Sequence, residues 1–277
     1  MEPVECSSQA AGRTVRYLEA GSGEPCVLLH AFPLSADMWR PQLEDPPAGW
    51  RLIAPDLRGF RGPSAAPVPA PEGPAAIDDY ARDVLALIDA LALPGAVVCG
   101  LSMGGYVAFA MWRLAPGRIR GFVLADTRAG ADSDEARARR RQMLELLARE
   151  GAAGIASVML PGLLGRTTRE TRPETVARVR ALVEANSPEA IGAAVWALME
   201  RPDSTPQLRE MTVPARLIVG EQDTLTPPDL AEEMRRRMPD AELTIIERAG
   251  HLTNLEMPGP FNSALAEFLA RLHVERG

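Results

Sequence analysis

The segment Gly100-Leu101-Ser102-Met103-Gly104-Gly105 decides how this chain is expected to fold. It follows an apolar run typical of a buried parallel strand, and apolar residues at helical spacing come after it. A sharp turn from strand to helix leaves no room for side chains two residues before and two residues after its serine, and Gly100 and Gly104 meet that demand. The segment therefore predicts a strand-turn-helix unit that exposes the Ser102 hydroxyl above the strand end.

Strands and helices alternate on both sides of this turn. Strands are expected at residues 26–29, 52–54, 97–99, 122–124, 215–219 and 242–246. Helices are expected at residues 77–93, 105–114, 229–238 and 261–272. Because such alternation is typical of parallel strands joined by right-handed crossovers, the fold class is α/β, with a mostly parallel sheet flanked by helices.

The pattern changes between residues 132 and 202, where Arg and Glu alternate with Leu, Met and Ala at helical spacing and no strand is evident. We interpret this stretch as an inserted helical cap. The chain is accordingly divided into a first part of the core at 1–130, the cap at 131–205 and a second part of the core at 206–277. Residues 63–74, rich in Pro and Ala, are predicted to form an exposed loop.

A serine hydroxyl is a weak nucleophile unless a base takes its proton, and the chain has three histidines to supply one. His251 follows a predicted strand, on a loop at the carboxyl edge of the sheet. His273 lies in the last predicted helix beside charged residues, which favours a surface position. His30 directly follows a buried strand and is expected to support the adjacent loop. We therefore assign the base to His251.

The imidazole in turn needs a carboxylate to fix its tautomer. Asp223 directly follows the strand at 215–219, and the order Ser102, Asp223, His251 is the order expected for hydrolases with this kind of turn. Asp126, which follows the strand at 122–124, is the alternative. Asp223 is favoured, because Thr127 and Arg128 next to Asp126 indicate a hydrogen-bonded structural turn.

Composition excludes several other functions. The 277 residues carry a net charge of -7 and contain no Lys, so no basic face is expected for nucleic acid. The three cysteines, Cys6, Cys26 and Cys99, lack disulfide or metal spacing, and nucleotide motifs are absent, so neither a metal nor a cofactor is expected. The chain shows neither an apolar leader nor a membrane-length apolar run, which favours a cytoplasmic protein.

With these motifs in place, the chain resembles the α/β-hydrolase superfamily over nearly its whole length. Further matches are His30-Ala31-Phe32-Pro33-Leu34-Ser35, Pro55-Asp56-Leu57-Arg58-Gly59-Phe60 and Gly220-Glu221-Gln222-Asp223. The resemblance implies that the backbone N–H groups of Phe32 and Met103 form an oxyanion hole. Within the superfamily the chain is most similar to small carboxylesterases, cofactor-free haloperoxidases or perhydrolases, and 3-oxoadipate enol-lactonases. One extra residue in the stretch 61–64, relative to these families, predicts a local loop change.

A serine at this turn predicts acyl transfer, and hence a serine hydrolase that cleaves small or medium carboxylic esters or lactones through an acyl-enzyme. The alternatives are an enol-lactonase for an anionic lactone, a perhydrolase-like activity and a catalytically silent ligand-binding scaffold. Arg166, Arg169 and Arg172 are consistent with attraction of an anionic substrate and equally with a solvated surface. The expected partner is a small molecule, with no nucleic acid or membrane, and a homo-oligomer is possible. The apolar cap residues could line the pocket or pack the cap helices together: Met143, Leu146, Leu147, Met159, Leu160, Leu163, Leu164, Trp196 and Met199.

Overall fold

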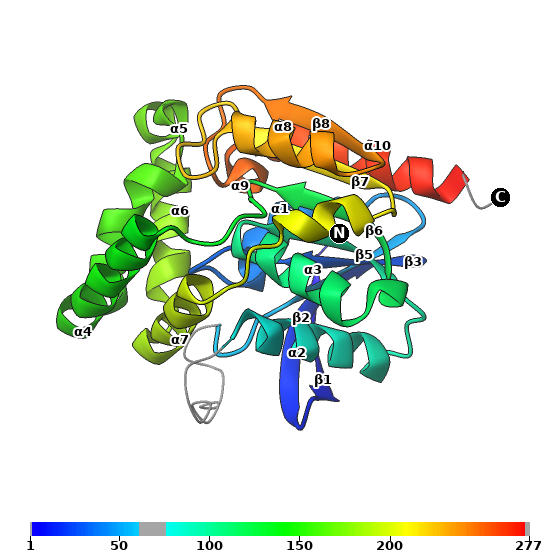
Figure 1. The fold of residues 1–277 in the computed structure, drawn as a ribbon, viewed down its shortest axis with the longest axis horizontal. Helices are drawn as coiled ribbons and strands as arrows, with labels where there is room; N and C mark the ends of the chain where they lie inside the picture. Colours follow the sequence, from blue (N-terminus) through cyan, green and yellow to red (C-terminus); the bar gives the residue numbers. More distant parts are fainter. Residues whose placement is uncertain (1, 61–75, 275–277) are drawn as a thin grey trace.

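An eight-stranded sheet forms the centre of the protein in the computed structural model, which describes residues 2–60 and 76–274 (Figure 1). The strand order is β1-β2-β4-β3-β5-β6-β7-β8. All neighbours from β4 to β8 pair in parallel, whereas β1 with β2 and β2 with β4 pair antiparallel. The strands are β1 (Val4–Ala10), β2 (Arg13–Gly21), β3 (Glu24–Leu29), β4 (Trp50–Pro55), β5 (Ala96–Leu101), β6 (Ile119–Ala125), β7 (Ala215–Gly220) and β8 (Ala241–Ile246). The predicted α/β class is therefore confirmed.

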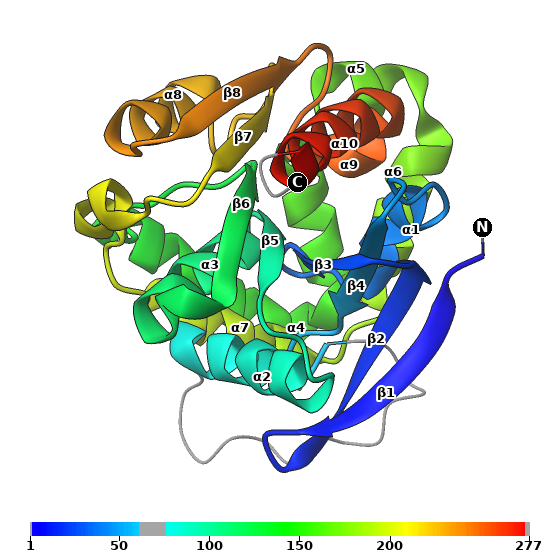
Figure 2. The ribbon, with the colours of Figure 1, turned by 90° about the vertical axis from the view of Figure 1, so that its right-hand side faces the viewer.

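Helices cover both faces of the sheet. Figure 2 shows α2, α3 and α8 on one face, and α1, α9 and α10 on the other. These six helices are α1 (Arg40–Leu43), α2 (Ile77–Ala90), α3 (Met103–Leu114), α8 (Pro228–Arg237), α9 (Thr253–Glu256) and α10 (Pro258–Val274). Short 3₁₀ turns are η1 (Ala36–Trp39), η2 (Pro116–Arg118) and η3 (Thr205–Glu210). Every residue of β5 is buried, as expected for a parallel strand covered on both faces.

The N-terminal hairpin of β1 and β2 was not predicted. Most of β1 is exposed or half-buried, so it lacks the apolar run by which the other strands were identified. The turn consists of Ala11 and Gly12, whose φ angles of 53° and 73° suit the tight hairpin turns that match the twist of the strands. Positive φ at both positions is easier for Asn-Gly, which is why this turn gave little sequence signal.

The insertion between β6 and β7 forms the expected helical cap. Its helices are α4 (Asp134–Leu163), α5 (Arg166–Thr171), α6 (Pro173–Glu184) and α7 (Pro188–Met199). Gly151, with φ of 61°, breaks the helical backbone of α4. The division of the chain at 130 and 205 stays a prediction. The loop predicted at 63–74 and the local change predicted at 61–64 lie outside the described residues. From residue 76 to residue 274 the structure describes the chain without a gap.

A hydrogen bond joins the two segments through which the chain enters and leaves the cap, at the carboxyl edge of the sheet. Ser204 N donates a hydrogen bond of 2.9 Å to Ala129 O, so the segment that follows β6 and the segment that returns from the cap are in contact. The cap therefore begins and ends at one place above the strand ends, where the serine turn also lies.

Candidate active site

Ser102 lies on the turn between β5 and α3 in a strained backbone conformation. Its φ is 54° and its ψ is -110°, which residues with a side chain rarely adopt. A Cβ at Gly104 would lie 2.1 Å from Leu29 O, and one at Gly100 would lie 2.4 Å from the backbone of Gly104. Strand and helix therefore approach as closely as the sequence predicted. Ser102 N donates to Ala125 O at 2.9 Å, which ties the turn to β6.

His251 lies on the loop after β8 and points its imidazole at this serine. Its Nε2 is 2.8 Å from Ser102 Oγ, and its Nδ1 is 2.8 Å from Asp223 Oδ2. The His251 ring is almost fully buried, and the Asp223 carboxylate is completely so. The structure thus brings together the three side chains that the sequence selected, in one hydrogen-bonded row.

The Asp223 carboxylate is held by the loop that follows β7. Its Oδ1 accepts hydrogen bonds from Leu225 N at 2.8 Å and Thr226 N at 3.0 Å, and its Oδ2 accepts one from Thr226 Oγ1 at 2.6 Å. Burial by itself raises the pKa of Asp223, but His251 and the Thr226 donors outweigh burial and lower it below its ordinary value. Asp223 is therefore ionised where it faces the imidazole. Thr226 was not identified from the sequence.

Asp126, the alternative acid, lies at the end of β6 with its carboxylate turned to other partners. Its Oδ1 accepts a hydrogen bond from Gly220 N at 2.9 Å, and its Oδ2 accepts one from Thr253 Oγ1. Burial and the nearby Asp223 charge raise the pKa of Asp126 well above its ordinary value. Asp126 thus joins β7 to the loop of His251, without a recorded bond to the imidazole itself.

His30 supports its loop, as expected. It is fully buried, its Nδ1 is 3.0 Å from Ala31 O, and its Nε2 lies 3.0 Å from Leu57 N. The Leu57 amide can only donate, so Nε2 is the acceptor and Nδ1 carries the proton. Burial lowers the pKa of His30 to about 4. The side chain of His273 lies outside the described residues.

The backbone N–H groups of Phe32 and Met103 belong to the segments that follow the neighbouring strands β3 and β5. Met103 opens α3, and the first amides of a helix have no acceptor within it. Phe32 follows β3, which pairs with β5 up to Leu29 and Gly100. The hydrogen bonds of the described residues include none donated by either amide. Both donors are thus left for a further acceptor.

Glu256 is a buried residue that sequence reasoning missed. Its side chain lies in α9, and its Oε1 accepts hydrogen bonds from Gly250 N at 2.9 Å and Leu252 N at 3.2 Å, on either side of His251. Its Oε2 accepts a bond of 2.8 Å from Gly165 N in the cap. An acidic residue five positions after the candidate base was the available signal.

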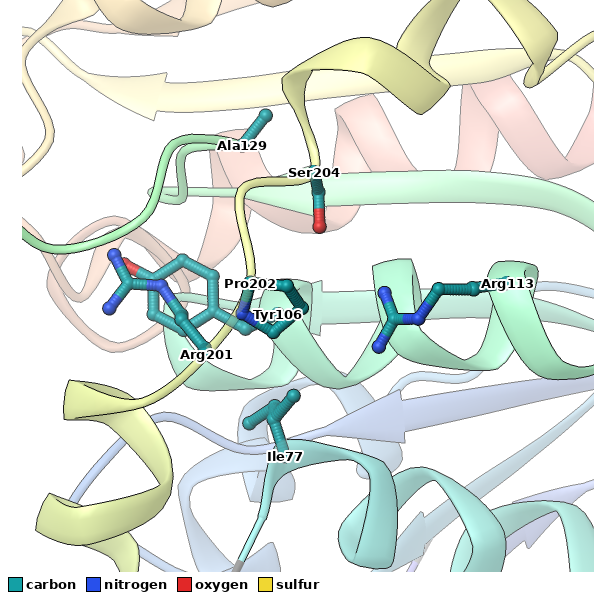
Figure 3. Close-up of a pocket in the computed structure, with 7 residues that line it drawn as sticks. All are labelled: Ile77, Tyr106, Arg113, Ala129, Arg201, Pro202 and Ser204. Atoms are coloured by element: carbon teal, nitrogen blue, oxygen red, sulfur yellow. The ribbon is translucent and has the colours of Figure 1, made fainter.

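A cluster of charged side chains links the two ends of the cap, which we call the base of the cap. The buried Asp132 carboxylate forms ion pairs with Arg128, Arg140 and Arg201. The Arg201 guanidinium also lies 4.1 Å above the ring of Tyr106, one helical turn after the serine (Figure 3). The cavity in Figure 3 has a volume of only about 10 Å³, on the order of one water molecule, and is too small for a substrate.

The cap residues proposed from the sequence have different surroundings. Arg166 and Arg169 are exposed, but Arg172 donates a hydrogen bond to the Glu256 carbonyl. Trp196 is 41% exposed. The remaining apolar residues are buried or half-buried, and nearly all belong to or pack against the hydrophobic core, which agrees with packing of the cap: Met143, Leu146, Leu147, Met159, Leu160, Leu163, Leu164 and Met199.

Within residues 2–60 and 76–274, no cluster of three or more His, Cys, Asp or Glu side chains is arranged to hold a metal ion. The helices in this part of the chain also include none with the length and apolar character needed to span a membrane.

Comparisons with known proteins agree with this fold. The chain is 36% identical to a thermophilic esterase from Thermogutta terrifontis, whose structure superposes with a TM-score of 0.89 over 99% of this chain and 100% of that one. The enol-lactonase of Burkholderia xenovorans LB400 is 26% identical, with a TM-score of 0.86 over 96% and 100%. The 3-oxoadipate enol-lactonase 2 of Acinetobacter baylyi is 29% identical over 94% of each chain. The model of the alpha/beta hydrolase family matches residues 26–264, and the chain belongs to this family.

Proposed function

We propose that this hydrolase cleaves small or medium carboxylic esters or lactones through an acyl-enzyme, with Ser102 as nucleophile, His251 as base and Asp223 as orienting acid. The observation that carries the proposal is the continuous row from Ser102 Oγ through His251 to Asp223, with both hydrogen bonds at 2.8 Å. The esterase and enol-lactonase relatives supply the substrate class. The substrate is a small molecule, and no cofactor takes part.

The reaction has two halves. Ser102 Oγ attacks the carbonyl carbon while His251 Nε2 takes its proton, and the oxygen that becomes negative accepts hydrogen bonds from Phe32 N and Met103 N. His251 then returns the proton to the leaving alkoxide oxygen as the ester bond breaks. Water then loses a proton to His251 and attacks the acyl carbon, and His251 returns that proton to Ser102 Oγ as the bond between Ser102 and the acyl group breaks and the acid is released. Asp223, fixed by Thr226, stabilises the imidazolium in both halves.

Hydrolysis of p-nitrophenyl esters of increasing acyl length tests the proposal. The wild-type protein should hydrolyse the short esters and Ser102→Ala should not, and a fluorophosphonate probe should label only the wild type. A wild type that is inert and unlabelled would instead support the silent ligand-binding scaffold. Esterase activity that survives in Ser102→Ala would remove Ser102 from the mechanism.

A second candidate within the same chemistry is an enol-lactonase for an anionic lactone. It is favoured by the two enol-lactonase relatives and by the exposed guanidinium groups of Arg166 and Arg169. Attraction between exposed charges is screened over about 8 Å at physiological salt, so hydrolysis of a carboxylated lactone should fall as salt rises. A neutral ester of similar size is the control, and equal salt dependence for both would remove this candidate. A perhydrolase-like activity and a cytoplasmic location stay predictions.

A further inference from the structure

The cap touches the loops of the proposed base and acid at one small interface, which we call the cap seam. Its residues form hydrogen bonds or pack backbone against backbone at both ends of α5. On the cap side they are Gly165, Thr167 and Arg172, and on the core side Gln222, Gly250 and Glu256.

Two glycines form the centre of the seam. A Cβ at Gly250 would lie 2.1 Å from Gly165 N, and a Cβ at Gly165 would lie 2.8 Å from Gly250 N. Real Cβ atoms essentially never come this close to backbone atoms, so the two chains meet without room for a methyl group. Gly250 directly precedes His251. A shift of the cap at Gly165 therefore presses on the residue next to the imidazole.

Side chains close the seam around this contact. Gln222, next to Asp223, forms a reciprocal pair with Thr167: Thr167 N donates to Gln222 Oε1 at 3.0 Å, and Gln222 Nε2 donates to Thr167 Oγ1 at 2.8 Å. Arg172 donates to the Glu256 carbonyl from the end of α5. The seam thus reaches the acid loop as well as the base loop.

Glu256 joins both sides through one carboxylate. Its three bonds come from N–H donors, so both carboxylate oxygens act as acceptors. Two of the donors, Gly250 N and Leu252 N, fix the backbone on either side of His251, and the third, Gly165 N, belongs to the cap. An amide in this place would turn its NH₂ toward at least one of these N–H groups.

From this arrangement we infer that Glu256 is a positioning residue that sets the imidazole of His251 against Ser102 and makes that setting depend on the docked cap. The position of the cap and the orientation of the His251 imidazole then change together. A substitution made only in the cap therefore alters the reactivity of Ser102. The inference rests on the proposed function, because it concerns the same base and nucleophile.

Three variants test it. Glu256→Gln changes the core side of the seam, because it replaces the carboxylate with an amide. Gly165→Ala changes only the cap side, because its methyl group forces the cap away from Gly250. Glu221→Gln is the matched control, since the exposed Glu221 carboxylate also accepts an N–H of the His251 loop, from Arg248 at 2.9 Å, but has no recorded bond to the cap. Each variant is compared with wild type in its rate constant for labelling by a small fluorophosphonate, and in kcat and KM per labelled site, with folding checked by circular dichroism.

Glu256→Gln and Gly165→Ala should each lower the labelling rate and kcat by about tenfold or more, because small misplacements of a catalytic group cost this much. Glu221→Gln should match the wild type. If Gly165→Ala changes only KM, or if folded Glu256→Gln labels at the wild-type rate, the inference is wrong. Should Glu256→Gln fail to fold, Gly165→Ala decides alone. An unlabelled wild type would count against the proposed function and not against the seam.

Discussion

Asp126 and Asp223 lie close enough for the charge of Asp223 to raise the pKa of Asp126, yet only Asp223 bonds to His251. The two carboxylates follow neighbouring parallel strands, β6 and β7. The Asp126 carboxylate is occupied by Gly220 N and Thr253, whereas Asp223 Oδ2 lies 2.8 Å from the imidazole. One carboxylate therefore supports the loops, and the other faces the base.

Replacement of each carboxylate by its amide should separate these roles. Asp223→Asn should lower kcat by about 10⁴, because the amide no longer favours the tautomer and charge that the imidazole needs. Asp126→Asn should retain most of the turnover, since Asp126 has no bond to the imidazole and the amide keeps an oxygen for Gly220 N and an NH₂ group for the Thr253 hydroxyl. Steady-state kinetics on one ester measures both. A larger loss in Asp126→Asn would move the orienting acid to β6.

His30 should make stability depend on pH. Its folded pKa of about 4 lies below its ordinary 6.5, so the unfolded chain binds more protons between these values and the free energy of unfolding falls as pH decreases through them. The loss between pH 7 and pH 5 should be about 2 kcal/mol. Urea unfolding at both pH values measures it. His30→Gln should lack this part of the pH dependence, and an unchanged dependence would show that other groups cause it.

Gly104→Ala should prevent formation of the serine turn, because its Cβ would lie 2.1 Å from Leu29 O. Backbone atoms at the centre of a sheet have little freedom to move, so we expect a loss of about 3 kcal/mol or more in the free energy of unfolding, together with loss of activity. Gly117→Ala is the control, since nothing lies within 4 Å of its Cβ. Equal stability of the two variants in urea would contradict the close approach.

Asp132→Asn should loosen the base of the cap. It removes the carboxylate that pairs with Arg201, whose side chain is only 2% exposed, and an uncompensated buried charge costs about 3 to 5 kcal/mol. The free energy of unfolding in urea measures the loss. Glu232→Gln, which breaks a surface pair with Arg235, should leave stability nearly unchanged. If the two substitutions have similar effects, the Asp132 cluster does not hold the cap.

The parallel part of the sheet and the hydrogen-bonded row of Ser102, His251 and Asp223 could be predicted because each leaves a local signal. Buried parallel strands are short apolar runs, and Gly100 and Gly104 mark the turn of Ser102 by their lack of side chains. The hairpin of β1 and β2 leaves no such signal, since one of its strands is largely exposed. Its place beside β4 depends on pairing across the chain, such as Tyr17 with Pro55, which spacing does not reveal.

The supporting residues were harder to find for a different reason. Thr226 and Glu256 act through hydrogen bonds to groups that folding brings near, so their identity in sequence is that of any threonine or glutamate. Arg172 shows the reverse case: its sequence suggests attraction of an anionic substrate, which stays a prediction, and gives no sign of the bond that its guanidinium makes to the Glu256 carbonyl. The order of Ser102, Asp223 and His251, by contrast, follows from which strand ends meet at the edge of the sheet.

The bond between Ser204 N and Ala129 O has a consequence for how this protein could be altered. Because the chain leaves and re-enters the sheet at adjacent points, the distance to be spanned is the same whatever lies between them. A helical segment of another length or sequence could be transplanted there while the strand register on either side is kept. Such an exchange would change which substrate binds above the sheet. The new segment would need a glycine opposite Gly250 and a backbone N–H group that donates to Glu256.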